Sequence, residues 1–460
     1  MKKGGAEMEN KKIDRRDFLK KLGILTGSAV IAPFLPGIVK KDFSLIENAH
    51  ADIVSNIFVS KNGDPITNVQ KVVDMAGGIA SYIDYDDIVV IKGNGQWSNQ
   101  GYTHTQAIKS MIDVILARPG GFGGEIVLAE NIHFNNSSLN NNCWVQTAAN
   151  RARNWSAYNW RELISAYQSG VFGTAHPNVI KAELCNSATS GTYSGDGYSL
   201  ITSPSQGRGY VSNNYTIQNC PGTPAQGRTR NLYYFMLQSS YSGKVFNLHR
   251  NGGVWVDGAY NSQKIKMIFM PNLNSHATSS ESYAGVTSAV KCHIGFNAGD
   301  GMHYIGYSDT PSLNVPRATG EAVGWFITNT IQPTLYVTVA EWAGWGGRTS
   351  DDATQTKTIG LCTDPVALDY WMAKNVLYPT HTAYAYLNPE NDNNTRKTLE
   401  GCQAMGVGTI NESEMLVSIY DYNNPLTTRL DIEKKIKQLK EGAATQSEVM
   451  SLIDMYMKGQ

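Results

Sequence analysis

The sequence has no excess of charge of either sign, because 39 Lys and Arg residues stand against 39 Asp and Glu residues. Proteins that bind nucleic acid or an anionic membrane surface concentrate basic residues, and nothing here indicates such a surface. Beyond residue 51 there is no apolar run of the roughly 20 residues that a membrane-spanning helix needs. Composition therefore predicts a protein without a nucleic-acid partner and without a membrane span once its N-terminal segment is removed.

Several familiar chemical motifs are missing as well. The 6 cysteines include no Cys-x-x-Cys pair, which argues against a cysteine zinc site, a thioredoxin-like redox pair and an iron–sulfur cluster. Their wide spacing predicts buried thiols or single pairs rather than a disulfide framework. The glycine-rich run at 119–124 matches neither phosphate-loop pattern, and no Gly-x-Ser-x-Gly elbow indicates a serine hydrolase.

The N-terminal segment is basic and then weakly apolar. The run Arg15-Arg16-Asp17-Phe18-Leu19-Lys20 closely resembles the twin-arginine translocation motif, and the apolar stretch at 22–39 follows it. A small-x-small cleavage site comes next, with Ala49 and Ala51 as its small residues. We expect a signal peptide over residues 1–51, read by the twin-arginine translocase at Arg15 and Arg16, and a periplasmic or extracellular protein. The alternative is an uncleaved N-terminal anchor.

Short apolar runs rich in β-branched residues recur along the rest of the chain. They are continuous rather than alternating, which is typical of strands covered on both faces. These runs lie at 88–91, 126–129, 265–270, 335–340 and 358–361. Helical spacing of apolar residues lies between them, at 105–116 and 365–376. The alternation predicts a layered α/β domain over residues 52–427 with a mostly parallel central sheet.

Residues from about 132 to 262 interrupt this rhythm because they are dense in Asn, Ser, Gly and Tyr. We expect a long polar, loop-rich insertion with one amphipathic helix near 154–167. Tryptophans such as Trp144, Trp155 and Trp160 are candidates for stacking on a ring-shaped ligand, although such residues more often pack inside. In the tail, two apolar stripes separated by Gly442 predict a C-terminal helical hairpin over 428–460.

Four ordered segments together resemble the family called domain of unknown function 362. They are Val90-Ile91-Lys92-Gly93-Asn94 with Thr103-His104-Thr105, then Ile126 to Asn131, then Pro271 to His276 with Gly285 to Lys291, and finally Cys362-Thr363-Asp364-Pro365-Val366-Ala367-Leu368-Asp369. The resemblance covers roughly residues 86 to 410 and implies an architecture rather than a reaction.

The chain departs from the family pattern at several positions. It has Asn274 where the family usually has Lys, Cys292 where it usually has Asn, and Gly93 where it often has Pro. It also lacks the cysteine run of the ferredoxin-like module that some relatives carry. If the missing lysine is catalytic in relatives, their activity does not transfer to this chain.

The polar residues of these segments follow the predicted strands, and ligands bind outside the carboxyl ends of parallel strands. Lys92, Glu130, His276, Glu341 and Asp364 each come at the end of one strand. We therefore predict one site of Lys92, Glu130, His276, Lys291 and Asp364, in which the lysines hold an anion and the other residues transfer protons. A divalent metal is the candidate cofactor, with ligands from His276, Glu341 and Asp364.

Structural alternatives exist for these residues. Asp364 precedes Pro365 at the start of a helix and is therefore an excellent N-cap, and Asp369 fits a satisfied carboxylate inside that helix. The alternative for Lys291 is a lysine that is simply exposed to solvent. The alternative for His276 is a histidine in a loop without a ligand role. Two functions stay open: an enzyme acting on a small anionic substrate with a metal or cofactor loaded before export, and a non-catalytic ligand-binding or interaction protein that uses the polar insertion.

Overall fold

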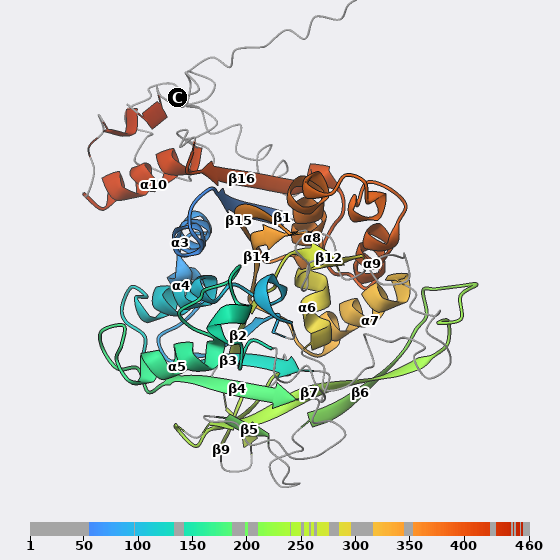
Figure 1. The fold of residues 1–460 in the computed structure, drawn as a ribbon, viewed down its shortest axis with the longest axis horizontal. Coiled ribbons are helices and arrows are strands. Elements are labelled where there is room, and N and C mark those ends of the chain that lie inside the picture. Colours follow the sequence, from blue (N-terminus) through green and yellow to red (C-terminus); the bar gives the residue numbers. More distant parts are fainter. Residues whose placement is uncertain are drawn as a thin grey trace, which may run out of the picture. The chain divides into compact units, whose positions relative to one another are not determined.

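Figure 1 shows the fold in a computed structural model of the chain. The structure describes residues 55–95, 97–132, 142–185, 198–200, 210–239, 241–249, 253–256, 259–261, 265–275, 285–295, 316–344, 353–423, 429–442, 445, 448–450 and 452–453. The chain divides into two compact units, Val54–Asn423 and a smaller unit of Met1–Ile53 with Asn424–Gln460.

An 8-stranded sheet forms the centre of the larger unit, in the order β16-β1-β15-β14-β11-β2-β3-β4 (Figure 1). Its strands are β1 (Ser55–Lys61), β2 (Ile88–Gly93), β3 (Glu125–Ile132), β4 (Val179–Cys185), β11 (Ile265–Met270), β14 (Leu335–Ala343), β15 (Thr354–Cys362) and β16 (Met415–Asp421). Neighbouring strands pair in parallel except at β15, which pairs antiparallel with both β1 and β14. The mostly parallel sheet with its helices confirms the predicted α/β class.

Helices cover both faces of this sheet. Successive residues of a strand point to opposite faces, so a continuous apolar strand has apolar side chains on both faces to bury. One layer holds α3 (Pro65–Met75), α4 (Thr105–Leu116) and α5 (Trp160–Gln168), which pack with Val89 and Ile91 of β2. The other layer holds α6 (Ala289–Gly295), α7 (Pro316–Asn329), α8 (Pro365–Met372) and α9 (Asn394–Gln403), which pack with Ile88 and Val90 (Figure 1). Short 3-10 and π turns lie at Ile79–Ser81, Asn99–Gly101, Ala148–Asn150, Ala373–Leu377, Tyr378–Thr380, Ala385–Leu387 and Glu412–Glu414.

The expected insertion over 132–262 needs correction in its first part. Residues 142–185 supply α5 and the edge strand β4, so they complete the central sheet. Helix α5 begins at Trp160 because Asn159 and Glu162 form a capping box at its start. A second, antiparallel sheet follows, made of β5 (Tyr198–Leu200), β6 (Tyr210–Thr216), β7 (Thr229–Ser239), β8 (Val245–Asn247), β9 (Val254–Val256) and β10 (Ala259–Tyr260). The described residues of this stretch thus combine strands, several of them short, with connecting turns such as the one at 217–228.

A buried carboxylate attaches this second sheet to the rest of the larger unit. Glu321 of α7 is 0% exposed and accepts hydrogen bonds from the Tyr215 hydroxyl at 2.6 Å and from the backbone N–H of Gln218 and Asn219. Leu232 and Phe246 of the second sheet also belong to the core cluster that contains Val90. The second sheet therefore shares the core of the α/β unit.

Helices α7 and α9 cross without space for side chains at their contact. A Cβ on Gly320 would lie 1.9 Å from the carbonyl oxygen of Thr398. We expect Gly320→Ala to lower the free energy of unfolding by about 3 kcal/mol, because the crowding atom is backbone and cannot rotate away. Urea denaturation followed by circular dichroism measures this loss. Asn329→Ala at the exposed end of α7 is the matched control, and a loss of equal size there would contradict the packing argument.

In the smaller unit, the structure describes α10 (Arg429–Lys440), whose Ile432 and Ile436 pack with Val449 and Ile453. The C-terminal helical hairpin stays a prediction, because its second helix is described only in short pieces. The expected signal peptide, with Arg15, Arg16, Ala49 and Ala51, lies outside the described residues. Within the described ranges, no helix has both the length and the apolar character that crossing a bilayer requires.

Candidate functional site at the carboxyl edge of the sheet

The carboxyl end of β2 carries a lysine inside the protein. Lys92 is 1% exposed, whereas lysine is almost never fully buried without a partner. Its Nζ lies 3.3 Å from Oε2 of Glu130, near the end of β3, and 3.4 Å from Sγ of Cys292 on α6. Both partners are buried. Lys92 and Glu130, two residues of the predicted site, are therefore brought together, and Cys292 joins them from a distant part of the sequence.

Two glycines allow the backbone to approach this trio closely. A Cβ on Gly95 would lie 2.5 Å from Cγ of Glu130 and 2.6 Å from Sγ of Cys143. A Cβ on Gly295, the last residue of α6, would lie 2.8 Å from Nζ of Lys92. Side chains at either position would displace the charged pair, so the loop after β2 and the end of α6 define its surroundings.

The charge state of the trio follows from burial and from mutual attraction. Burial opposes the charge of Lys92, but the Glu130 carboxylate beside it, together with the hydrogen bond to the Cys292 sulfur, outweighs burial and raises the pKa of Lys92 above its ordinary value. Burial raises the pKa of Cys292 to about 12, although Lys92 acts in the opposite direction. The Cys292 thiol is therefore protonated at neutral pH, and the Glu130 carboxylate balances the ammonium group.

Lys92 retains hydrogen-bonding capacity. A lysine ammonium has three N–H donors. Among the described residues, its Nζ contacts Glu130 and Cys292, which provide two acceptors. The third donor can serve an acceptor from outside this set, and an anion is the acceptor that a buried ammonium prefers.

Neighbouring polar residues fix the loop that leads from β2 to α4. The Thr103 hydroxyl donates to the carbonyl of Met270 at 2.7 Å, and the backbone N–H of Asn272 donates to Oδ1 of Asn94 at 3.0 Å. These bonds fasten the loop to the end of β11. His104, at the N-cap position of α4, is buried, and burial lowers its pKa to about 4. Its imidazole is therefore neutral at pH 7.

Glu341 has different neighbours from Lys92. It lies inside β14 at a register shift between Ala340 and Trp342, and it accepts a hydrogen bond from Nε2 of Gln355 at 2.7 Å. Burial raises the pKa of Glu341, while the Gln355 hydrogen bond and Lys357 act against this rise. Among the described residues, its hydrogen-bond partner Gln355 belongs to β15 and not to the group around Lys92.

The structure separates Asp364 from Lys92. Because β15 runs antiparallel to β14, its carboxyl end lies at the edge where the parallel strands begin. There, Oδ2 of Asp364 accepts hydrogen bonds from the Ser55 hydroxyl at 2.5 Å and from the Thr409 N–H at 3.0 Å. The prediction that the candidate residues converge at one edge is therefore wrong for Asp364. The proposed metal set fails for the same reason, since Glu341 and Asp364 do not meet.

Asp364 is an N-cap, as the structural alternative predicted. Its Oδ1 accepts the N–H of Val366 at 2.8 Å and the N–H of Ala367 at 3.0 Å at the start of α8. Burial raises the pKa of Asp364, and the hydrogen bonds from Ser55, Ala367, Val366 and Thr409 oppose this rise. Gly408 must be glycine, because its φ is +63° and its Cβ would lie 1.9 Å from Oδ1 of Asp364.

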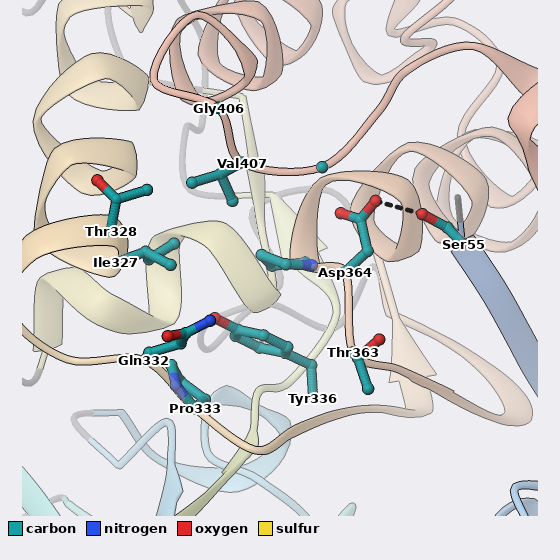
Figure 2. A pocket seen from close by; sticks show the side chains of 12 residues that line it. Ser55, Ile327, Thr328, Gln332, Pro333, Tyr336, Thr363, Asp364, Gly406 and Val407 are labelled. Atoms are coloured by element: carbon teal, nitrogen blue, oxygen red, sulfur yellow. Dashed lines mark hydrogen bonds between the residues drawn. The ribbon is translucent and has the colours of Figure 1, made fainter. Parts of the chain in front are cut away.

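Asp364 also lines a pocket of about 240 Å³ at this edge of the sheet (Figure 2). Tyr336, Ile327 and Val407 form much of its wall, and the Asp364 carboxylate turns toward Ser55. Both carboxylate oxygens are already occupied by the four donors described above, so Asp364 has little capacity left for a ligand.

Lys291 lies in α6 one residue before Cys292, but it faces different residues. It is 7% exposed, so the alternative of a solvated lysine is wrong. It lines a small cavity with Asp369 of α8 and with Thr395 and Thr398 of α9. The α6 residue that reaches Lys92 is Cys292, which the sequence marked only as a departure from the family pattern.

The remaining candidates divide into two kinds. His276 lies outside the described residues, and within the described part of the chain no group of three His, Cys, Asp or Glu residues is placed to hold a metal ion. Trp144 and Trp160 are 3% and 0% exposed and pack edge to face with ring centroids 5.4 Å apart. These two tryptophans are core residues and not a surface for ring stacking.

Comparison with known proteins gives no relatives: no family model matches the chain, and neither a curated protein nor a solved structure matches it significantly. The fold and the Lys92 site together define an α/β protein with a buried ammonium–carboxylate pair, Lys92 and Glu130, near the carboxyl ends of two parallel strands.

Proposed function

We propose that this chain is an exported protein of the type called domain of unknown function 362, and that it is an enzyme acting on a small anionic substrate. Lys92 is the cation that holds the substrate. The observation that supports this proposal is a buried ammonium with hydrogen-bonding capacity to spare, at the edge of a parallel sheet where ligands bind.

Glu130 and Cys292 have distinct parts in this proposal. The Glu130 carboxylate keeps Lys92 charged before the substrate arrives, and it is the nearest group to accept or return a proton. Burial keeps the Cys292 thiol protonated, and a protonated thiol is a poor nucleophile. Cys292 therefore serves as a neutral neighbour of Lys92 and not as the attacking group. Export through Arg15 and Arg16 with cleavage after Ala51 belongs to the same proposal and places the activity outside the cytoplasm.

A non-catalytic extracytoplasmic ligand-binding protein is the second candidate function. It is favoured by the protonated Cys292 and by burial that raises the pKa of Cys143 far above its ordinary value, because neither cysteine is then a ready nucleophile. The two functions differ in one measurement. An enzyme converts an anion that it binds, whereas a binding protein releases it unchanged, as mass spectrometry of the recovered ligand would report.

Anion binding is tested on the full chain with inorganic phosphate, acetate, oxalate and citrate as probes. We expect at least one probe to raise the melting temperature by several degrees, since a ligand at 100 times its Kd adds about 2.7 kcal/mol of stability. The Lys92→Met Glu130→Gln double variant, which removes both buried charges, is expected to lose that shift.

Lys109→Met is the matched control, because Lys109 forms a partly exposed ion pair with Asp113 within α4. It should respond to the probes as the parent chain does. An undiminished shift in the double variant, or no shift with any of the four probes, would count against Lys92 as the anion site.

A further inference from the structure

A second acidic residue of α8 joins that helix to α6. Asp369 is 2% exposed, and its two oxygens accept the backbone N–H of Ala289 at 2.7 Å and of Val290 at 2.9 Å. The Ser288 side chain forms a further hydrogen bond with it. One carboxyl group therefore fastens the first turn of a neighbouring helix.

Helix α6 carries this attachment to the Lys92 site. Its residues run from Ala289 to Gly295, and its Cys292 and Gly295 are the two that approach Lys92. A helix this short has little stability of its own, so its position depends on the contacts at its ends. Loss of the Asp369 attachment would therefore loosen one wall of the Lys92 site.

Charged and titratable groups surround Asp369 from each helix packed against it. Lys291 of α6 shares a cavity of about 10 Å³ with it, and Asp364 of its own helix repels it. The charge of Asp369 also contributes to raising the pKa of three neighbouring groups, which are Cys292, Cys402 of α9 and Tyr336 of β14. Among the described groups, Asp364 is thus the charged neighbour that disfavours ionisation of the Asp369 carboxyl.

Burial raises the pKa of Asp369 to about 7, against the lowering effect of the hydrogen bonds from Val290, Ser288 and Ala289. A carboxyl whose pKa is raised in the packed state binds its proton more tightly there than when hydrated. The packed junction is therefore most stable below the ordinary aspartate pKa of about 4, and it loses stability as the pH rises toward 7.

We propose that Asp369 is a positioning residue that holds α6 against Lys92 while protonated and that lets α6 separate from α8 more readily once ionised. The Lys92 site is then more open in mildly alkaline than in mildly acidic surroundings. This inference rests on the proposed function only where it concerns ligand binding. The movement of α6 stands on the junction itself.

Hydrogen–deuterium exchange of the full chain, followed by mass spectrometry without any added anion, measures this movement. Protection of the peptide covering residues 285–295, corrected for intrinsic exchange, should fall about tenfold from pH 6 to pH 8. Asp369→Asn should abolish this dependence on pH, because its side chain does not ionise. The α4 peptide serves as the internal control.

Asp74→Asn, at an exposed position of α3, is the matched variant and should keep the pH dependence of the parent chain. If Asp369→Asn fails to fold, Ser288→Ala serves instead. It removes a hydrogen bond that favours the charged form, so the fall in protection should move to higher pH. Equal protection of α6 at pH 6 and pH 8 in the parent chain would overturn the proposal, and so would an unchanged pH dependence in Asp369→Asn. Failure of anion binding alone would affect only the proposed function.

Discussion

Lys92→Met is expected to lower the free energy of unfolding by about 3–5 kcal/mol, because it removes the ammonium group that lies 3.3 Å from the buried Glu130 carboxylate. The Lys92→Met Glu130→Gln double variant should regain most of this loss, since replacing a buried ion pair by neutral groups of similar size is often nearly neutral. Urea denaturation of the parent chain, both single variants and the double variant completes the thermodynamic cycle.

The coupling free energy between Lys92 and Glu130 shows whether the loss of stability comes from breaking this ion pair. Lys109→Met, which removes a partly exposed partner of Asp113, should change stability by about 0.5 kcal/mol or less. A double variant that loses as much as the sum of the two single variants would show that Lys92 and Glu130 are not coupled. It would then remove the basis for treating them as one charged unit.

Asp364→Ala is expected to lower the free energy of unfolding by about 3–4 kcal/mol. The substitution removes the N-cap of α8 and also leaves the Ser55 hydroxyl and the Thr409 N–H without their acceptor. Differential scanning calorimetry and urea denaturation measure the loss. Asp392→Ala, at an exposed carboxylate near Lys397, is the control and should stay within about 0.5 kcal/mol.

The same variant separates structural from functional roles. Because Asp364 lies at the opposite edge from Lys92, the folded fraction of Asp364→Ala should still show the anion-induced rise in melting temperature. If the variant lost that rise but kept its stability, Asp364 would belong to the ligand site, as the sequence first suggested.

Five strands of the central sheet were predictable because they are continuous runs of β-branched and apolar residues. The other three were not. β1 and β16 lie at one side of the sheet; β1 mixes exposed with buried positions, and β16 has only exposed and partly exposed ones. β4 lies within a polar stretch that resembles a loop. Strands of such mixed character carry no periodic signal that distinguishes them from connecting segments.

Lys92 and Glu130 were predicted together because both come near the carboxyl ends of strands that pair in parallel. The same reasoning failed for Asp364, because strand direction depends on topology, and the run at 358–361 reads alike in either direction. Cys292 was missed as a partner because its contact with Lys92 spans 200 residues of sequence. Such contacts are decided by tertiary packing and not by local pattern.

The pairing of β1 has a consequence for how the chain acquires its structure. Its partners β15 and β16 lie 303 and 360 residues further along, since Phe58 pairs with Leu361 and Ser55 with Met415. During synthesis, β1 leaves the ribosome long before either partner exists, and its buried residues Ile57 and Val59 have no sheet to join. Completion of the sheet must therefore wait until β16 has been synthesised, and sequence-distant pairing of this kind makes folding slow and leaves apolar strand residues exposed in the meantime.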